Sequence, residues 1–256
     1  MVNKPNIDKL IDRYQEQINE QYSHIESCLY TWADRKPIIQ AGFHALDTIN
    51  LEYVYESALV SAVTAWQSFS ADWVVAALTN DSSVLRQKLA ANQRLVRVTV
   101  GSAAVFRPAA ELRKHPAQWE VRGLLEQPSE GSYLSVNYQS HWGKFKNLMG
   151  PDYVAKVDSL TANDFTFIEF CTKLRNMSAH RSDESYTKVK EAVTGPQIRK
   201  IDREEKVKLA RDNGIRRGKV GHYLAAEMRN PYGGGRQNTR LAFMLGRLRR
   251  VSERLR

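Results

Sequence analysis

The 256-residue chain contains only two cysteines, Cys28 and Cys171. They form neither a CxxC motif nor a cysteine and histidine pattern with the spacing of zinc ligands. We therefore expect no disulfide framework, no structural metal, and no metal or cofactor at the functional site. Two isolated cysteines are typical of a protein in a reducing compartment.

Long hydrophobic runs are also missing. No stretch approaches the roughly 20 consecutive apolar residues that a membrane-spanning helix needs. The first residues, MVNKPNIDKLIDRYQ, lack the apolar core of a signal peptide. From these absences we predict a cytoplasmic protein with no membrane partner.

Acidic side chains are scarce only in one part of the chain. The formal net charge is +10, and residues 196–256 hold 17 Lys+Arg against 6 Asp+Glu, whereas the preceding residues hold 21 against 22. A basic segment favours a polyanionic partner, with nucleic acid first. A solvated tail, or a tail that binds an acidic protein, is the alternative. We predict a domain over 1–195 and a basic helical C-terminal extension over 196–256.

Hydrophobic periodicity predicts that the domain is mainly helical. Apolar residues recur every three or four positions from Asn6 to about Asp34. The segment from Ile38 to Leu78 is apolar on nearly every face, and Glu56 is its only charged residue between Tyr53 and Ala71. We expect this segment to be a central helix surrounded by other helices. Further helices are expected over 82–92, over 137–149 and, in the charged region, over 197–212.

Two stretches have other patterns. RLVRVTVGSAAVFRP alternates apolar and polar residues around Gly-Ser, which predicts a small β-hairpin or extended insertion. The last segment, RLAFMLGRLRRVSERLR, has leucines on one face and arginines around it. It predicts an amphipathic basic helix suited to phosphate, to an acidic partner or to the same helix of a second copy.

The segment FTFIEFCTKLRNMSAH carries the candidate site. Thr161 and Asp164 precede it as an approximate capping box, and Arg175, Asn176 and His180 lie at its far end. Asn176 and His180 are four residues apart and share one helical face, which the long side chain of Arg175 can also reach. A second pair with the same spacing, Arg217 and His222, lies in a glycine-rich stretch without an apolar face, and we interpret it as coincidence.

An apolar helix that ends in LRNMSAH resembles the HEPN superfamily, whose hallmark is an arginine, four to six residues beginning with a polar one, and a histidine. YESALVSAVTAWQSFSADWVVAAL is similar to the long second helix of its RiboL-PSP-like branch. The resemblance covers about 50–78 and 158–193. It implies an all-α, up-and-down HEPN-like helical bundle that pairs as a two-fold homodimer, with both Arg-x4-His motifs lining one cleft.

The resemblance also implies a function. Many HEPN proteins are metal-independent endoribonucleases in toxin–antitoxin or antiviral defence systems, whereas others have lost catalysis and bind RNA or proteins. In the branch whose toxin is silenced by nucleotidylation, a tyrosine stands two residues after the histidine. Ser182 occupies that place here, which argues against silencing by that route.

The chemistry of RNA cleavage asks for the same residue types. Attack by the 2′-hydroxyl needs a base, an acid for the leaving 5′-oxygen and positive charge for the phosphorane. Histidine titrates near neutral pH and serves as base or acid, and arginine can hold two phosphate oxygens. We predict His180 as the acid/base, Arg175 as the phosphate contact and Asn176 as the positioning residue. Glu56 is a further candidate: it could pair with Arg175 or His180 and orient it, or it could only favour the N-terminal end of its helix or face water.

Basic side chains near the motif and in the tail are candidates for RNA contacts: Arg181, Arg216, Arg217, Lys219, Arg247, Arg249 and Arg250. The leading hypothesis is a dimeric endoribonuclease, with an antitoxin or other regulatory protein as a further partner class. One alternative is a non-catalytic HEPN-like module that binds RNA or regulates; another is an adaptor whose basic tail binds an acidic protein. In the plainest alternative, Arg175 and His180 are solvated residues at the end of a helix and have no catalytic role. Positive charge is favourable there because the C-terminal end of a helix is partly negative.

Overall fold

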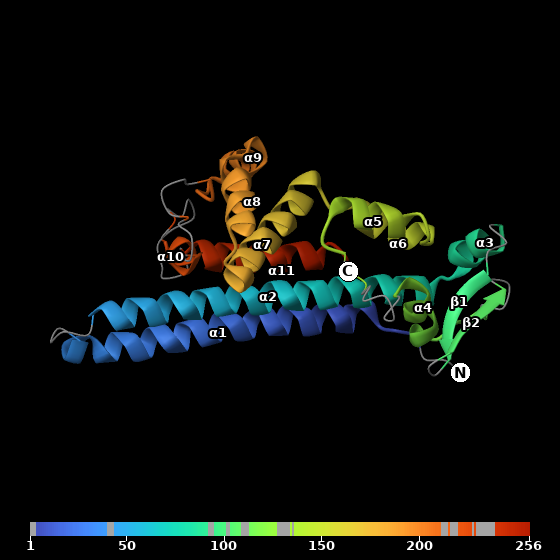
Figure 1. The fold of residues 1–256 in the computed structure, drawn as a ribbon, viewed down its shortest axis with the longest axis horizontal. Helices are drawn as coiled ribbons and strands as arrows, with labels where there is room; N and C mark the ends of the chain where they lie inside the picture. The colour runs from blue at the N-terminus through green and yellow to red at the C-terminus, as the bar shows by residue number, and fades with distance from the viewer. Residues whose placement is uncertain are drawn as a thin grey trace. The chain divides into compact units, whose positions relative to one another are not determined.

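The computed structural model describes residues 4–39, 44–91, 95–100, 103–108, 113–126, 134, 136–210, 215, 220–226, 228 and 239–256, without the side chains of 29–50 and of both strands. Within these ranges helices predominate, and one pair of strands accompanies them (Figure 1). The predicted all-α helical bundle is confirmed at this level.

The first helices match the predicted ones closely: α1 (Ile7–Ile39), α2 (His44–Asn80) and α3 (Ser83–Ala91). β1 (Leu95–Val100) and β2 (Ala103–Pro108) then pair antiparallel, with Leu95 opposite Pro108. The hairpin expected at RLVRVTVGSAAVFRP is therefore present. The remaining elements are α4 (Gln118–Leu125), α5 (Gln139–Lys146), α6 (Pro151–Asp158), α7 (Ala162–His180), α8 (Asp183–Thr194), α9 (Pro196–Glu205), α10 (Val220–Ala225) and α11 (Arg240–Glu253).

The chain forms two compact units. Unit 1 consists of Met1–Arg13, Gln67–Leu160 and Glu253–Arg256, and unit 2 consists of Tyr14–Trp66 and Thr161–Ser252. The boundary predicted at residue 195 lies inside unit 2, between α8 and α9, so the units follow a different division. The functional division into a domain and an extension stays a prediction.

Unit 1 has an aromatic core around Trp73 of α2. The Trp73 ring lies 5.7 Å from that of Trp142 and 6.1 Å from that of Tyr153, measured between centroids. Its indole Nε1 donates a hydrogen bond of 3.0 Å to the carbonyl of Leu255. Because a buried indole N–H needs an acceptor, the last residues of the chain complete this core.

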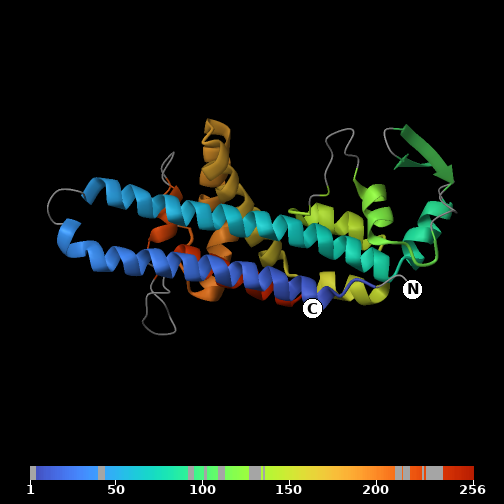
Figure 2. The same cartoon turned by 90° about the horizontal axis from the view of Figure 1, so that it is seen from below.

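Unit 2 is built on α7 and on the adjoining parts of α1 and α2, which lie side by side in both views (Figure 1, Figure 2). Tyr14 and Trp66 meet edge to face, with ring centroids 5.6 Å apart. The predicted buried face of α7 is confirmed at Phe165, Ile168 and Leu174. Phe167 and Phe170 are buried as well, so α7 is enclosed on more than one face.

The apolar face of α11 packs inside unit 2. Its buried side chains are Leu241, Met244, Leu245, Leu248 and Val251. The Tyr22 hydroxyl of α1 donates a hydrogen bond to the carbonyl of Ala242. The helix as a whole was predicted to suit phosphate, an acidic partner or the same helix of a second copy, and the structure shows that its apolar face is covered by its own chain.

Candidate functional site

The candidate site lies at the C-terminal end of α7, within unit 2. The capping box at the other end of this helix forms as predicted: the Thr161 side chain accepts from the Asp164 amide, and Asp164 accepts from the Thr161 amide at 2.9 Å. Arg181 ends the helix in the left-handed conformation with φ 49°, and its N–H donates to the Met177 carbonyl. A buried helix with fixed ends therefore positions the motif backbone.

The structure joins two of the three motif side chains. Arg175 NH1 donates a hydrogen bond of 3.1 Å to Asn176 Oδ1, and both residues are half-buried. In the described ranges no carboxylate pairs with Arg175, and its buried Nε has no hydrogen-bond partner there. A half-buried guanidinium without a counter-charge favours binding of an anion.

His180 occupies the last position of α7 and is exposed. Within the described part of the chain, no hydrogen bond or ion pair links it to Arg175 or Asn176. The exposed imidazole at the end of α7 is open to a ligand, as a general acid or base must be.

Glu56 does not have the partner that we predicted. One carboxylate oxygen accepts a 2.9 Å hydrogen bond from the Gly221 amide, and the other lies 3.6 Å from an Arg181 guanidinium nitrogen. Glu56 thus contacts the neighbour of the motif histidine instead of Arg175 or His180. A Cβ on Gly221 would lie 2.2 Å from the Glu52 carbonyl oxygen, so only glycine lets α10 approach α2 this closely.

Tyr53 is a member of this cluster that the sequence did not single out. The Arg181 guanidinium lies over the Tyr53 ring, 5.5 Å from its centroid. Tyr53 is three residues before Glu56 on α2, so the two side chains share a helix face. Glu56 is the only charged residue between Tyr53 and Ala71, and the spacing of three residues from it is the signal that could have identified Tyr53.

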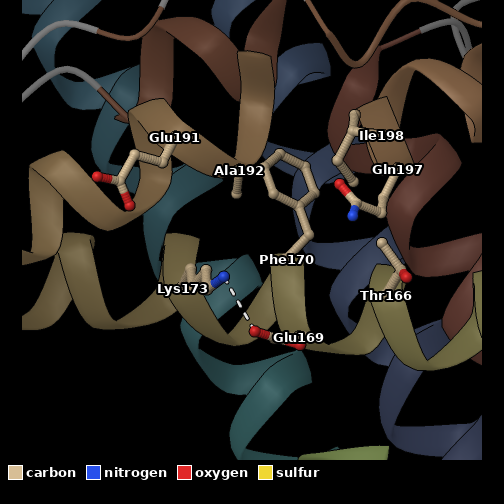
Figure 3. A pocket seen from close by; sticks show the side chains of 8 residues that line it. All are labelled: Thr166, Glu169, Phe170, Lys173, Glu191, Ala192, Gln197 and Ile198. Carbon is tan, nitrogen blue, oxygen red and sulfur yellow. Dashed lines mark ion pairs between the residues drawn. The ribbon is translucent and has the colours of Figure 1, made fainter. Parts of the chain in front are cut away.

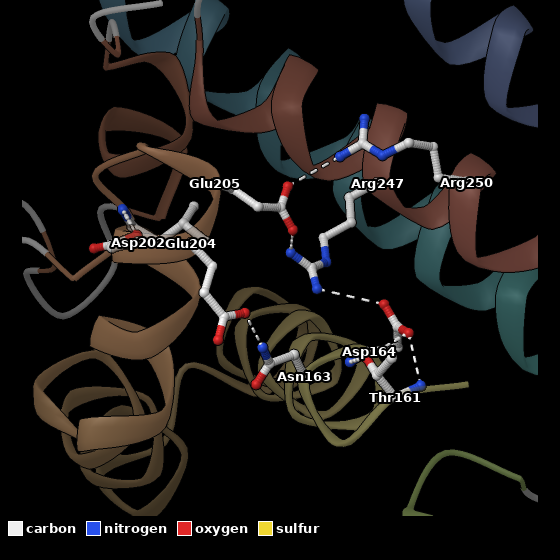
Figure 4. A network of polar contacts seen from close by, with 9 residues as sticks. Thr161, Asn163, Asp164, Asp202, Glu204, Glu205, Arg247 and Arg250 are labelled. Atoms are coloured by element: carbon white, nitrogen blue, oxygen red, sulfur yellow. Dashed lines mark hydrogen bonds and ion pairs between the residues drawn. The ribbon is translucent and has the colours of Figure 1, made fainter. Parts of the chain in front are cut away.

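Arg247, one of the predicted RNA contacts, is part of a buried ionic network (Figure 4). Its guanidinium pairs with Glu205, lies 3.4 Å from Asp164 and stacks 4.8 Å from the centroid of Phe167. Burial lowers the pKa of Arg247, while the Asp164 carboxylate raises it. Buried and paired in this way, Arg247 holds α7, α9 and α11 together, and we remove it from the RNA-binding set.

Of the other predicted RNA contacts, Arg181 lies against Glu56 and Tyr53, and the remaining ones divide into two groups. Arg249 and Arg250 are exposed on α11, where Arg249 donates to Asn19 and Arg250 donates to Glu205 at 3.1 Å. Arg216, Arg217 and Lys219 lie outside the described residues.

A separate pocket of about 320 Å³ opens among α7, α8 and α9 (Figure 3). Its lining includes Phe170 and Glu191. It also includes an ion pair between Lys173 Nζ and Glu169 Oε1, which lie 2.9 Å apart. None of the predicted catalytic residues lines this pocket, so it is distinct from the motif.

Among the described residues, no group of three or more histidine, cysteine, aspartate or glutamate side chains could hold a metal ion. In the same residues, no helix combines the length and the apolar character that crossing a membrane requires. Comparison of the chain with protein-family models, with curated proteins and with solved structures finds no match.

Proposed function

We propose that this protein is a HEPN-type endoribonuclease that cleaves RNA without a metal ion. The observation that carries the proposal is the end of α7, where Arg175 has an amide partner but no carboxylate partner among the described residues, five residues before an exposed histidine. A phosphate is the anion that fits this combination, because arginine binds its oxygens and histidine transfers protons beside it.

In the proposed reaction the 2′-hydroxyl oxygen attacks the adjacent phosphorus, and the bond from phosphorus to the 5′-oxygen breaks. An unprotonated imidazole takes the 2′-hydroxyl proton, and a protonated imidazole gives a proton to the leaving oxygen. The products are a 2′,3′-cyclic phosphate and a 5′-hydroxyl. Arg175 stabilises the charge that develops on the phosphorane, and Asn176 holds the guanidinium in place.

One motif supplies one histidine, whereas the reaction needs a base and an acid. We therefore propose a homodimer in which the second copy provides the other imidazole. Support comes from the exposure of His180 and of the residues that follow it, Arg181, Ser182, Asp183 and Glu184. The active species should then have twice the mass of the 29.3 kDa chain in light scattering.

The test is RNA cleavage in the presence of EDTA. The wild type should produce fragments that end in a 2′,3′-cyclic phosphate, and His180→Ala should lower the rate by at least about 100-fold. His222→Ala is the matched control, because it removes the histidine of the other Arg-x4-His match and should keep the wild-type rate. Loss of activity in His222→Ala but not in His180→Ala would move the site to the tail.

The main alternative is a non-catalytic module that binds RNA. It is favoured because, in the described ranges, no hydrogen bond or ion pair orients His180. Intact RNA together with salt-sensitive binding would support this alternative over the enzyme.

We place the proposed nuclease activity in the cytoplasm, as a toxin or in defence. Expression of the wild type, but not of His180→Ala, should then slow the growth of the host cells.

A further inference from the structure

Tyr53 is unusual among the aromatic residues of unit 2. Large exposed hydrophobic side chains in the described part of the chain are Tyr53 at 52%, Trp119 at 69% and Tyr138 at 37%. Trp119 and Tyr138 belong to unit 1, and Tyr138 packs against His141. Among the described residues, Tyr53 is thus the large aromatic side chain that is exposed in the unit that carries the motif.

Arg181 is also placed unusually. It adopts φ 49°, a conformation in which helices most often end with glycine, because a Cβ there strains the backbone. Its side chain is 48% exposed and lies over Tyr53. Arg181 thus occupies a position where glycine would be less strained, and it places a guanidinium over Tyr53 that glycine could not supply.

Glu56 fixes this pair. Its carboxylate is buried, is held by the Gly221 amide at 2.9 Å and lies 3.6 Å from the Arg181 guanidinium. The order of contacts runs from Gly221 to Glu56, Arg181 and Tyr53. It presets an aromatic ring and a planar cation, and the cation belongs to the residue that directly follows His180 in the chain.

We propose that Tyr53 and Arg181 form a nucleobase-stacking site for single-stranded RNA. Every base has a π face that stacks on tyrosine or on a guanidinium, and unpaired bases are the ones free to do so. Since Arg181 follows His180 directly, the stacked base would belong to a nucleotide next to the phosphate that is cleaved. This site rests on the proposed function and adds a preference for unpaired RNA. The rival is a surface cation–π pair that only stabilises the fold.

The test measures RNA binding in the His180→Ala background, where cleavage is blocked. The probe is a single-stranded RNA of about 12 nucleotides that carries 2-aminopurine, and the matched duplex serves for comparison. Tyr53→Leu keeps an apolar side chain but loses the π face, and it should weaken single-strand binding about tenfold and abolish the quenching of 2-aminopurine. Tyr53→Phe keeps the ring and should bind within about twofold of its parent. Trp119→Leu, which removes the exposed tryptophan of unit 1, should change neither readout.

A second pair of variants separates binding from folding. Arg181→Gly and Lys206→Gly each replace a residue with positive φ at a helix end by glycine. Both should keep the melting temperature close to that of the parent, because glycine relieves the strain. In Arg181→Gly this gain offsets the loss of the ion pair between the half-exposed Arg181 and Glu56, whose carboxylate keeps its hydrogen bond from the Gly221 amide. Only Arg181→Gly should weaken RNA binding.

The two proposals fail in different ways. If His180→Ala abolishes cleavage while Tyr53→Leu leaves affinity and quenching unchanged, the stacking site is overturned and the nuclease stands. If the wild type cleaves no RNA but Tyr53→Leu still weakens binding, the nuclease is overturned and the stacking site stands.

Discussion

At the scale of single residues, the partners of a guanidinium decide what an arginine does. Arg175 and Arg247 both lie in unit 2, but Arg247 pairs with Asp164 and Glu205, whereas Arg175 has an amide partner. Two carboxylates neutralise Arg247 and leave no charge for a ligand. Arg175 keeps its charge available, which is why the functional proposal depends on it.

Arg247→Ala should destabilise the protein by roughly 3 to 5 kcal/mol, because it leaves Asp164 buried without its cation. Arg250→Ala is the matched control. Arg250 contacts the same Glu205, but its side chain is 60% exposed, so its loss should cost less than about 1 kcal/mol. Urea unfolding of the three proteins measures both values. Equal effects of the two substitutions would contradict the assigned role of Arg247.

Sequence patterns predicted the residues of the site better than their partners. The capping box of Thr161 and Asp164 is local and therefore visible in the sequence. The contact between Glu56 and Gly221 joins residues 165 positions apart, and no period or spacing encodes it. Tyr53 has its place in the site only through that long-range contact and Arg181.

At the scale of secondary structure, the long periodic segments and some short elements, α3, α5 and the hairpin, were predictable, whereas other short helices were not. α2 and α7 have the expected character, but α4 and α6 have only 8 residues each, too few for a clear period. The helix predicted over 137–149 ends at Lys146 as α5, and Gly150-Pro151 then starts α6, with proline at the first helical position. α1 continues past Pro37 to Ile39, beyond the end near Asp34 that the periodicity predicted.

The end of α9 has a local cause that periodicity could not reveal. We expected this helix to reach residue 212, but it ends at Glu205. Asp202 accepts hydrogen bonds from the amides of Leu209 and Ala210, at 2.7 and 2.8 Å. A side chain that binds backbone amides beyond the helix competes with further helical turns.

The contact between α1 and α11 predicts a pH dependence. Burial raises the pKa of Tyr22 from 10.0 to about 12 in the folded protein. The folded state therefore favours the neutral phenol, and stability from Tyr22 is fully present below pH 10.0 and is lost as the pH rises toward 12. At about pH 8, Tyr22→Phe should cost roughly 1 kcal/mol, because the bond to Ala242 is lost.

By about pH 11 the wild type should lose more than about 1 kcal/mol relative to Tyr22→Phe, which has no phenol to ionise. Urea unfolding at both pH values measures the difference. The two proteins should then be nearly equal in stability, or Tyr22→Phe should be the more stable. A difference that stays constant with pH would show that the Tyr22 hydroxyl is not buried against α11.

At the scale of the whole chain, charge and burial give different accounts of residues 196–256. The charge excess suggested an appendage. In the structure, residues of α9, α10 and α11 are buried in unit 2, among them Ile201, Tyr223 and Leu245. The net charge of a segment can be counted from its composition. Whether its apolar faces are buried depends on which other residues of unit 2 cover them, and the sequence of the segment does not show this.

A chain that ends at residue 195 should therefore fail to fold cooperatively. It would lose the buried side chains of α9, α10 and α11 from unit 2, and the Leu255 acceptor of Trp73 from unit 1. Each large buried apolar side chain contributes roughly 1.5 to 3 kcal/mol, so a few of them exceed a total stability of about 5 to 15 kcal/mol. Thermal unfolding followed by near-ultraviolet circular dichroism should show no sharp transition.

The control is the full chain with Lys200→Gln and Arg249→Gln, which removes exposed charge and should melt like the wild type. A sharp transition in the truncated chain would show instead that 196–256 is a separable extension, and only then could deletion test its binding to RNA or to an acidic protein. Otherwise charge-neutralising substitutions are the sound test, because they change the electrostatic attraction without removing the core.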